Sequence, residues 1–171
     1  MDFVIRPYRE SDAPEVLKII NDSILHTSHN YDYEPKKLEE IQAQFSDKLQ
    51  AGLPVLVGEI EEKVCGYATY GVFRAKPGYR RTLEHSIYLN AKAQGKGLGT
   101  QMMKRLIKIA ENQGYHVMIA GMDSENTGSY RFHERLGFTE VARIPEVAFK
   151  FNKWLCLVLM QLIINPDQQP R

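Results

Sequence analysis

The stretch IYLNAKAQGKGLGT, residues 87–100, determines how the rest of the chain is interpreted. It predicts a buried strand, a short turn and a glycine-rich loop that opens a helix ending near Gly114. Apolar residues recur on one face of that helix, namely Leu98, Met102, Leu106 and Ile109. The N-terminus of such a helix offers unpaired backbone N–H groups and the positive end of a dipole, and glycines let a ligand approach closely. The stretch therefore predicts a phosphate or pyrophosphate site.

The glycine spacing matches neither an NTP-binding P-loop nor the G-x-G-x-x-G dinucleotide pattern, because Gly95, Gly97 and Gly99 alternate singly. The order Gln94-x-x-Gly97-x-Gly99 resembles the acetyl-CoA pyrophosphate loop of the GNAT N-acetyltransferase superfamily. An ordinary strand-to-helix turn is the alternative at this point.

Length and composition indicate one globular domain. The chain has 171 residues, of which 43% are hydrophobic and 25% charged, and we expect a single domain over residues 1–164 with a poorly ordered tail at 165–171. The net charge of +1 supplies no field that would attract nucleic acid or an anionic membrane. No signal peptide or bilayer-spanning segment is expected. Cys65 and Cys156 are predicted to be free thiols, and the expected location is the cytoplasm.

Hydrophobic periodicity and turn residues predict eleven elements. Strands are expected at residues 3–8, 55–60, 64–73, 82–89, 116–122, 138–144 and 150–164. A capping box of Asp12 and Glu15 should start the first helix, and Pro35 should open the second, which ends at Gly52. Asn126 should cap a short helix that ends at Gly137. The order βααβββαβαββ predicts an α/β fold with helices on both faces of a sheet.

This order matches the GNAT fold, whose central sheet is mixed and mostly antiparallel. Four stretches, at residues 82–88, 119–126, 132–138 and 150–154, resemble the phosphinothricin acetyltransferase branch. The resemblance implies transfer of an acetyl group from acetyl-CoA to the α-amino group of phosphinothricin, methionine sulfone or methionine sulfoximine. It also implies a homodimer.

Acetyl transfer requires a neutral amine, donors for a tetrahedral oxyanion and a departing thiolate. An α-amino group is largely protonated at neutral pH, so a base must lie within reach, directly or through water. Glu84 is the candidate base, because it precedes the glycine loop on the same strand and the resemblance places the catalytic glutamate there. The alternative is a strand-edge carboxylate paired with Arg80 or Arg81.

His133 is the second candidate catalytic residue. Many GNAT enzymes have a tyrosine at the matching place, which is thought to protonate the thiolate, whereas this chain has a histidine that can serve as acid or base. The alternatives are a core histidine bonded to a backbone carbonyl, or a contact to CoA. His85 should point to the face opposite Glu84, as a structural or substrate-adjacent residue.

The resemblance also implies the cofactor contacts. The backbone of Ile87, Tyr88 and Leu89 should bind pantetheine, and the Leu89 N–H should donate to the oxyanion. The predicted pyrophosphate residues are Gly95, Lys96, Gly97, Leu98, Gly99 and Thr100. Asn126 can be both a helix cap and a CoA contact.

The loop from Arg74 to Arg81 carries four cations, which can clamp the acceptor's carboxylate and its phosphinate or sulfone oxygens. A solvated surface loop is the alternative. The predicted acceptor contacts are Arg74, Ala75, Lys76, Arg80, Glu84, His85, Ser86 and Tyr31. No metal is expected, because His26 and His29 lack a third ligand nearby.

Two other functions are also compatible with the sequence. One keeps the fold but changes the acceptor to a protein N-terminus or a polyamine. The other is a CoA-binding sensor without catalysis, which would have no need of both Glu84 and His133.

Overall fold

The computed structural model describes residues 2–166. These residues divide into two compact units, and each is considered by itself. Within the described residues, the first unit covers 2–69 and 86–106, and the second covers 70–85 and 107–166.

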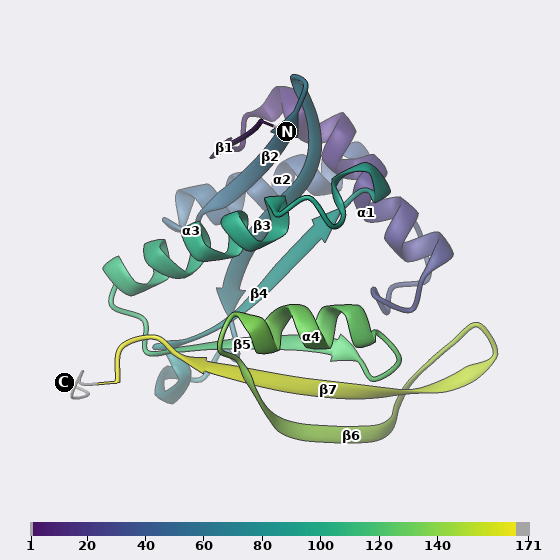
Figure 1. Ribbon diagram of the computed structural model, residues 1–171, viewed down its shortest axis with the longest axis vertical. Coiled ribbons are helices and arrows are strands. Elements are labelled where there is room, and N and C mark those ends of the chain that lie inside the picture. The colour runs from purple at the N-terminus through teal and green to yellow at the C-terminus, as the bar shows by residue number, and fades with distance from the viewer. Residues whose placement is uncertain (1, 167–171) are drawn as a thin grey trace. The chain divides into compact units, whose positions relative to one another are not determined.

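The described residues form seven strands and four α-helices (Figure 1), and short 3-10 turns lie in three of the connections. The strands are β1 (Phe3–Pro7), β2 (Val55–Ile60), β3 (Lys63–Val72), β4 (Thr82–Leu89), β5 (Val117–Asp123), β6 (Thr139–Lys150) and β7 (Lys153–Ile163). The helices are α1 (Ala13–His26), α2 (Leu38–Gln50), α3 (Leu98–Asn112) and α4 (Thr127–Arg135). Their order along the chain is βααβββαβαββ, which confirms the predicted order.

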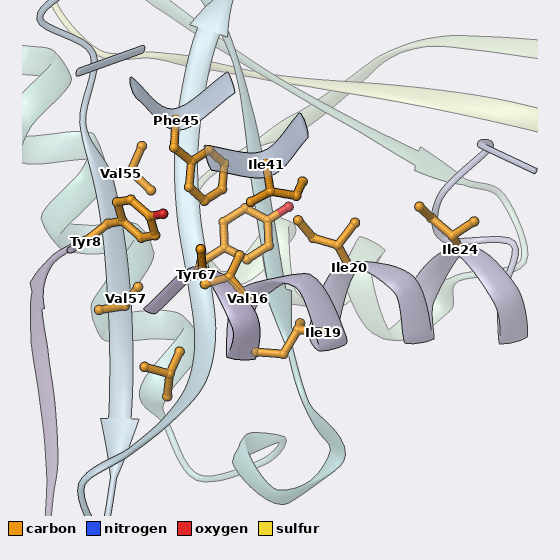
Figure 2. Close-up of a cluster of buried hydrophobic side chains, with 12 residues drawn as sticks. Tyr8, Val16, Ile19, Ile20, Ile24, Ile41, Phe45, Val55, Val57 and Tyr67 are labelled. Atoms are coloured by element: carbon orange, nitrogen blue, oxygen red, sulfur yellow. The ribbon is translucent and has the colours of Figure 1, made fainter. Parts of the chain in front are cut away.

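In the first unit, β2 pairs antiparallel with both β1 and β3. Apolar faces of α1 and α2 meet side chains of these strands in a buried cluster (Figure 2). In this cluster the ring of Phe45 lies 5.0 Å from the ring of Tyr8 and 5.6 Å from the ring of Tyr67. Such edge-on and tilted aromatic packing is favourable beyond simple area burial.

The first residues of α3 pack closely on β2 at Gly58. A Cβ atom there would lie 2.8 Å from both Leu98 Cδ1 and Met102 Sδ, so any larger residue would force these buried side chains to shift. Leu98, Met102 and Leu106 are fully buried, as their spacing predicts.

In the second unit, β4 pairs parallel with β5 through Thr82–Glu84, β5 pairs antiparallel with β7, and β7 with β6. Of the five ladders described here for the two units, the one between β4 and β5 is parallel and four are antiparallel. The prediction of a mixed, mostly antiparallel sheet is therefore confirmed. Gly114 and Gly137 follow α3 and α4 with φ of 79° and 92°, the left-handed conformation expected after a helix.

The prediction that Pro35 opens the second helix is wrong, because α2 begins at Leu38. The side chain of Asn21 accepts from the N–H of Lys36 at 2.8 Å and donates to its C=O at 3.0 Å. These two bonds hold the backbone at Lys36 outside the helix.

The predicted capping box of Asp12 and Glu15 is also wrong. The Asp12 carboxylate makes no capping bond to α1; it accepts two bonds of 2.8 Å from the Arg6 guanidinium and one of 2.7 Å from the Arg9 N–H. Arg6 also donates to Glu59 at 2.9 Å. The Asp12 carboxylate therefore belongs to a partly buried ion cluster, and it does not cap the helix as the local spacing predicted.

Strand β6 is longer than predicted at its C-terminal end, and β7 begins later than predicted. β6 continues past Ile144 to Lys150, because an irregularity between Ile144 and Ala148, with Glu146 at φ 53°, hides its period. Phe151 and Asn152 turn with φ of 49° and 59°, so β7 begins at Lys153.

At the other end of β7, Asn165 donates to the C=O of Tyr115 at 2.6 Å, and its own C=O lies 2.7 Å from His116 Nδ1. Most of the predicted tail, residues 167–171, lies outside the described residues. Among residues 2–166, no helix is long and apolar enough to cross a bilayer.

Candidate functional site

Strand β4 places two titratable residues on opposite faces. Successive side chains of a strand alternate, so Glu84 and His85 point in opposite directions, as predicted. Glu84 is exposed, whereas His85 is only 7% exposed. The side chain of Glu84 is therefore accessible to solvent, whereas the imidazole of His85 is enclosed by protein.

The Glu84 carboxylate lies beside the backbone of Gly121 in β5. Its Oε1 atom is 3.2 Å from the position that a Cβ atom on Gly121 would occupy. Partial burial raises the pKa of Glu84 above its usual value, and among residues 2–166 no cation acts to lower it. The alternative of a carboxylate paired with Arg80 or Arg81 is therefore disfavoured, and the Arg81 guanidinium instead donates to the C=O of Gly114 at 2.8 Å.

His85 and His133 form a buried pair. Their Nε2 atoms are 3.0 Å apart, and His133, on α4, is 3% exposed. Nδ1 of His133 lies 2.8 Å from the backbone C=O of Ser129. The Phe138 ring packs edge-on against both imidazoles, at centroid distances of 5.8 and 5.2 Å.

These contacts define the protonation of the pair. The C=O of Ser129 can only accept, so Nδ1 of His133 carries a proton and its Nε2 accepts from Nε2–H of His85. Burial lowers the pKa of both imidazoles, and the proximity of His133 lowers that of His85 further. Both residues are thus neutral at pH 7, and Nδ1 of His85 has no hydrogen-bond partner among residues 2–166.

Asn126 caps α4. Its Oδ1 accepts from the N–H of Ser129 at 3.1 Å, which confirms the predicted cap. Its predicted contact to CoA stays a prediction.

The glycine loop and the end of β4 belong to the first unit. Gly95 and Gly97 have φ of 72° and 82°, a conformation that other residues adopt only with strain. The C=O of Gly97 accepts from the N–H of Gln101 at 3.1 Å, so α3 starts here and the N–H groups of Leu98, Gly99 and Thr100 lie in its first turn. Lys96 is exposed.

The end of β4 packs tightly against β3. The ring of Tyr88 stacks on that of Tyr67 at 5.7 Å, and the N–H of Asn90 donates to the C=O of Cys65 at 2.8 Å. Ile87, Tyr88 and Leu89 are half-buried, and they lie beyond Glu84, where the ladder to β5 ends.

The cationic loop is in the second unit. The Arg74 guanidinium lies over the rings of Phe73 and Tyr79, at 5.3 and 5.9 Å from their centroids. This stacking limits the freedom of an exposed side chain. Ala75, Lys76 and Arg80 are exposed, whereas in the first unit Ser86 is exposed and Tyr31 half-buried.

Residue spacing did not indicate the neighbours of Glu84. Methyl groups of Leu157 and Leu159, on β7, lie 3.6 Å from the same position beside Gly121. A glycine inside the apolar run of β5 was the available signal, since such a residue often marks close approach. Among residues 2–166, no three His, Cys, Asp or Glu side chains gather as a possible metal site.

A model of the acetyltransferase (GNAT) family matches residues 19–138, and the chain belongs to this family. An L-methionine sulfoximine/L-methionine sulfone acetyltransferase of Pseudomonas aeruginosa is 40% identical over 169 residues, which cover 98% of each chain. A phosphinothricin N-acetyltransferase of Alcaligenes faecalis is 34% identical over 162 residues, covering 94% of this chain and 82% of the relative.

A solved structure also supports membership of this family. An acetyltransferase from Salmonella typhimurium with its cofactor acetyl-CoA superimposes with a TM-score of 0.96 at 38% identity, over 100% of this chain and 99% of that one. The predicted GNAT fold and the predicted resemblance to the phosphinothricin and methionine sulfone branch are therefore confirmed.

Proposed function

We propose that this chain transfers the acetyl group of acetyl-CoA to the α-amino group of a small amino acid such as methionine sulfone, methionine sulfoximine or phosphinothricin. The observation that carries the proposal is Glu84, an exposed carboxylate of raised pKa on the strand that runs into the glycine loop. The names of relatives that align over almost the whole chain support the class of acceptor.

Glu84 is the proposed base. It accepts a proton from the acceptor's ammonium, directly or through a water, so that the neutral amine can attack the thioester carbon. The tetrahedral intermediate then collapses with cleavage of the C–S bond, and the departing CoA thiolate takes up the proton that the nitrogen loses as the amide forms. A carboxylate whose pKa is raised is a better match to this task near neutral pH than an ordinary surface carboxylate.

The proposed cofactor residues act through backbone groups. The N–H groups in the first turn of α3 bind the diphosphate together with Gly95 and Lys96, while Ile87–Leu89 bind pantetheine beyond the last rung of the ladder to β5. The N–H of Leu89 polarises the thioester carbonyl and stabilises the oxyanion as it forms.

For His133, the geometry favours the structural role over acid catalysis. Both of its ring nitrogens are bound to protein atoms, and the proton on Nδ1 is held by Ser129. The pair with His85 joins α4 to β4, which positions the strand that carries Glu84.

Arg74 and Lys76, together with Arg80, are the proposed clamp for the acceptor's anionic groups. Stacking on Phe73 and Tyr79 prepares the Arg74 guanidinium for bidentate binding of a carboxylate or phosphinate.

The chain is also proposed to act in the cytoplasm as a homodimer. Free Cys65 and Cys156 support the reducing compartment. Exposed apolar side chains near the turn between β6 and β7 support a covered surface there; they are Val147 (47% exposed), Phe149 (41%), Phe151 (54%) and Trp154 (62%). Light scattering that gives the mass of one chain would overturn the dimer.

Release of CoA tests the activity. Methionine sulfone, methionine sulfoximine and phosphinothricin should each be acetylated, whereas exclusive use of a peptide N-terminus or a polyamine would contradict the proposed acceptor class. Glu84→Gln should lower turnover by about 100-fold or more with acetyl-CoA affinity retained. Glu134→Gln, an exposed carboxylate on α4, is the matched control and should leave turnover unchanged.

A further inference from the structure

Gly121 interrupts the buried apolar run of β5 at the place where Glu84 approaches. Glu84 is opposite Ile119 in the parallel ladder, and Gly121 lies two residues further along the same face of β5. In the antiparallel ladder on the other side, Gly121 is opposite Leu159 of β7. Gly121 thus lies between the carboxylate and an apolar strand.

Three side chains surround the position that a Cβ atom of Gly121 would occupy. Oε1 of Glu84 is 3.2 Å from it, and Leu157 Cδ1 and Leu159 Cδ2 are each 3.6 Å from it. The carboxylate therefore lies beside the bare backbone of β5 at Gly121, and two leucine methyl groups approach the same glycine.

We propose that Gly121 is a positioning residue for Glu84: the missing side chain lets the carboxylate lie beside β5, at a glycine that Leu157 and Leu159 also approach. This inference rests on the proposed function, in which Glu84 is the base. Glu84 as a whole is exposed, so its carboxylate can meet the acceptor's ammonium.

The geometry makes Gly121→Ala a selective perturbation. A contact of 3.2 Å is tighter than about nine in ten Cβ contacts in proteins, so Glu84 must move by a few tenths of an ångström. The leucines, at 3.6 Å, are at ordinary van der Waals distance and need not move. Because Glu84 is an exposed, flexible side chain, the carboxylate should shift while the fold stays intact.

A cycle of Gly121→Ala with Glu84→Gln tests this role. In the wild-type background, Gly121→Ala should lower kcat about tenfold, since small displacements of a catalytic group are costly. The melting temperature and the dissociation constant for acetyl-CoA should stay unchanged. In the Glu84→Gln background, Gly121→Ala should lower kcat no further, because no carboxylate remains to be displaced.

Gly128→Ala is the matched control, because a Cβ there meets only Asn126 Oδ1 at 3.9 Å, and turnover should stay unchanged. An equal loss from Gly121→Ala in both backgrounds, or no loss in the wild type, would overturn the positioning role while the proposed function stands. If Glu84→Gln alone leaves turnover unchanged, the base itself is overturned and the positioning role falls with it.

Discussion

Gly66→Ala should damage both the fold and acetyl-CoA binding. Gly66 lies in β3, and a Cβ atom there would be 2.2 Å from Leu89 Cδ2 and 2.8 Å from the backbone oxygen of Tyr88. The leucine can change its rotamer, but the Tyr88 oxygen belongs to the backbone of β4 and can move only if the strand moves. The strand that moves is the one proposed to bind pantetheine.

The size of the effect follows from the kind of clash. Overpacking of a well-packed region costs about 2 kcal/mol. For a chain of 171 residues this lowers the melting temperature by roughly 4–8 °C. Loss of one hydrogen bond between β4 and pantetheine, at about 1 kcal/mol, raises the dissociation constant of acetyl-CoA about fivefold.

Differential scanning calorimetry and isothermal titration with acetyl-CoA measure the two effects. Gly128→Ala serves as the control, because its nearest neighbour would be at 3.9 Å and alanine suits a helix. A Gly66→Ala protein with the melting temperature and acetyl-CoA affinity of the wild type would refute the packing argument.

Three further predictions follow from charge and burial. The value of kcat/KM for the acceptor should fall as the pH drops through the raised pKa of Glu84, because a protonated carboxyl cannot accept a proton. If the same fall of kcat/KM at low pH persists in Glu84→Gln, Glu84 is not its source. Burial keeps the folded-state pKa of His85 and His133 below 6.5, so the unfolded chain binds more protons than the folded one, and the melting temperature should fall as the pH drops below about 6.5. A variant with both residues changed to Gln should show a weaker dependence of the melting temperature on pH. An equal dependence in that variant would exclude the histidine pair as its source. Asp12→Ala should lower the free energy of unfolding by about 2 kcal/mol in urea titrations, since it leaves the partly buried Arg6 guanidinium with fewer partners. Asp22→Ala, in an exposed pair, should change the free energy of unfolding by less than about 0.5 kcal/mol. Equal losses in the two variants would contradict this prediction.

Features that depend on neighbours in sequence were predictable. The apolar face of α3, the glycine after α4 at Gly137 and the cap at Asn126 all follow from interactions within a few residues. The side of β4 to which Glu84 points also follows from local alternation, since a strand has a period of two residues. These features were sufficient to predict the order of elements.

Features that depend on distant residues were not predictable. The Asp12 carboxylate accepts from the Arg6 guanidinium and the Arg9 N–H, and not from the N–H of Glu15 as in a capping box. His85 and His133 are 48 residues apart, so nothing in the local pattern of either indicates their 3.0 Å contact. The same holds for Gly121, whose proposed role depends on neighbours in β4 and β7, the two strands that pair with β5.

A crystal structure of the protein with acetyl-CoA and methionine sulfone tests the central claim most directly. The account predicts the diphosphate on the N–H groups of residues 97–100, the thioester oxygen at the N–H of Leu89, and the acceptor's nitrogen within hydrogen-bonding distance of Glu84 or of a water bound to it. A nucleotide bound elsewhere, or a Glu84 carboxylate that points away from the acceptor's nitrogen, would contradict it.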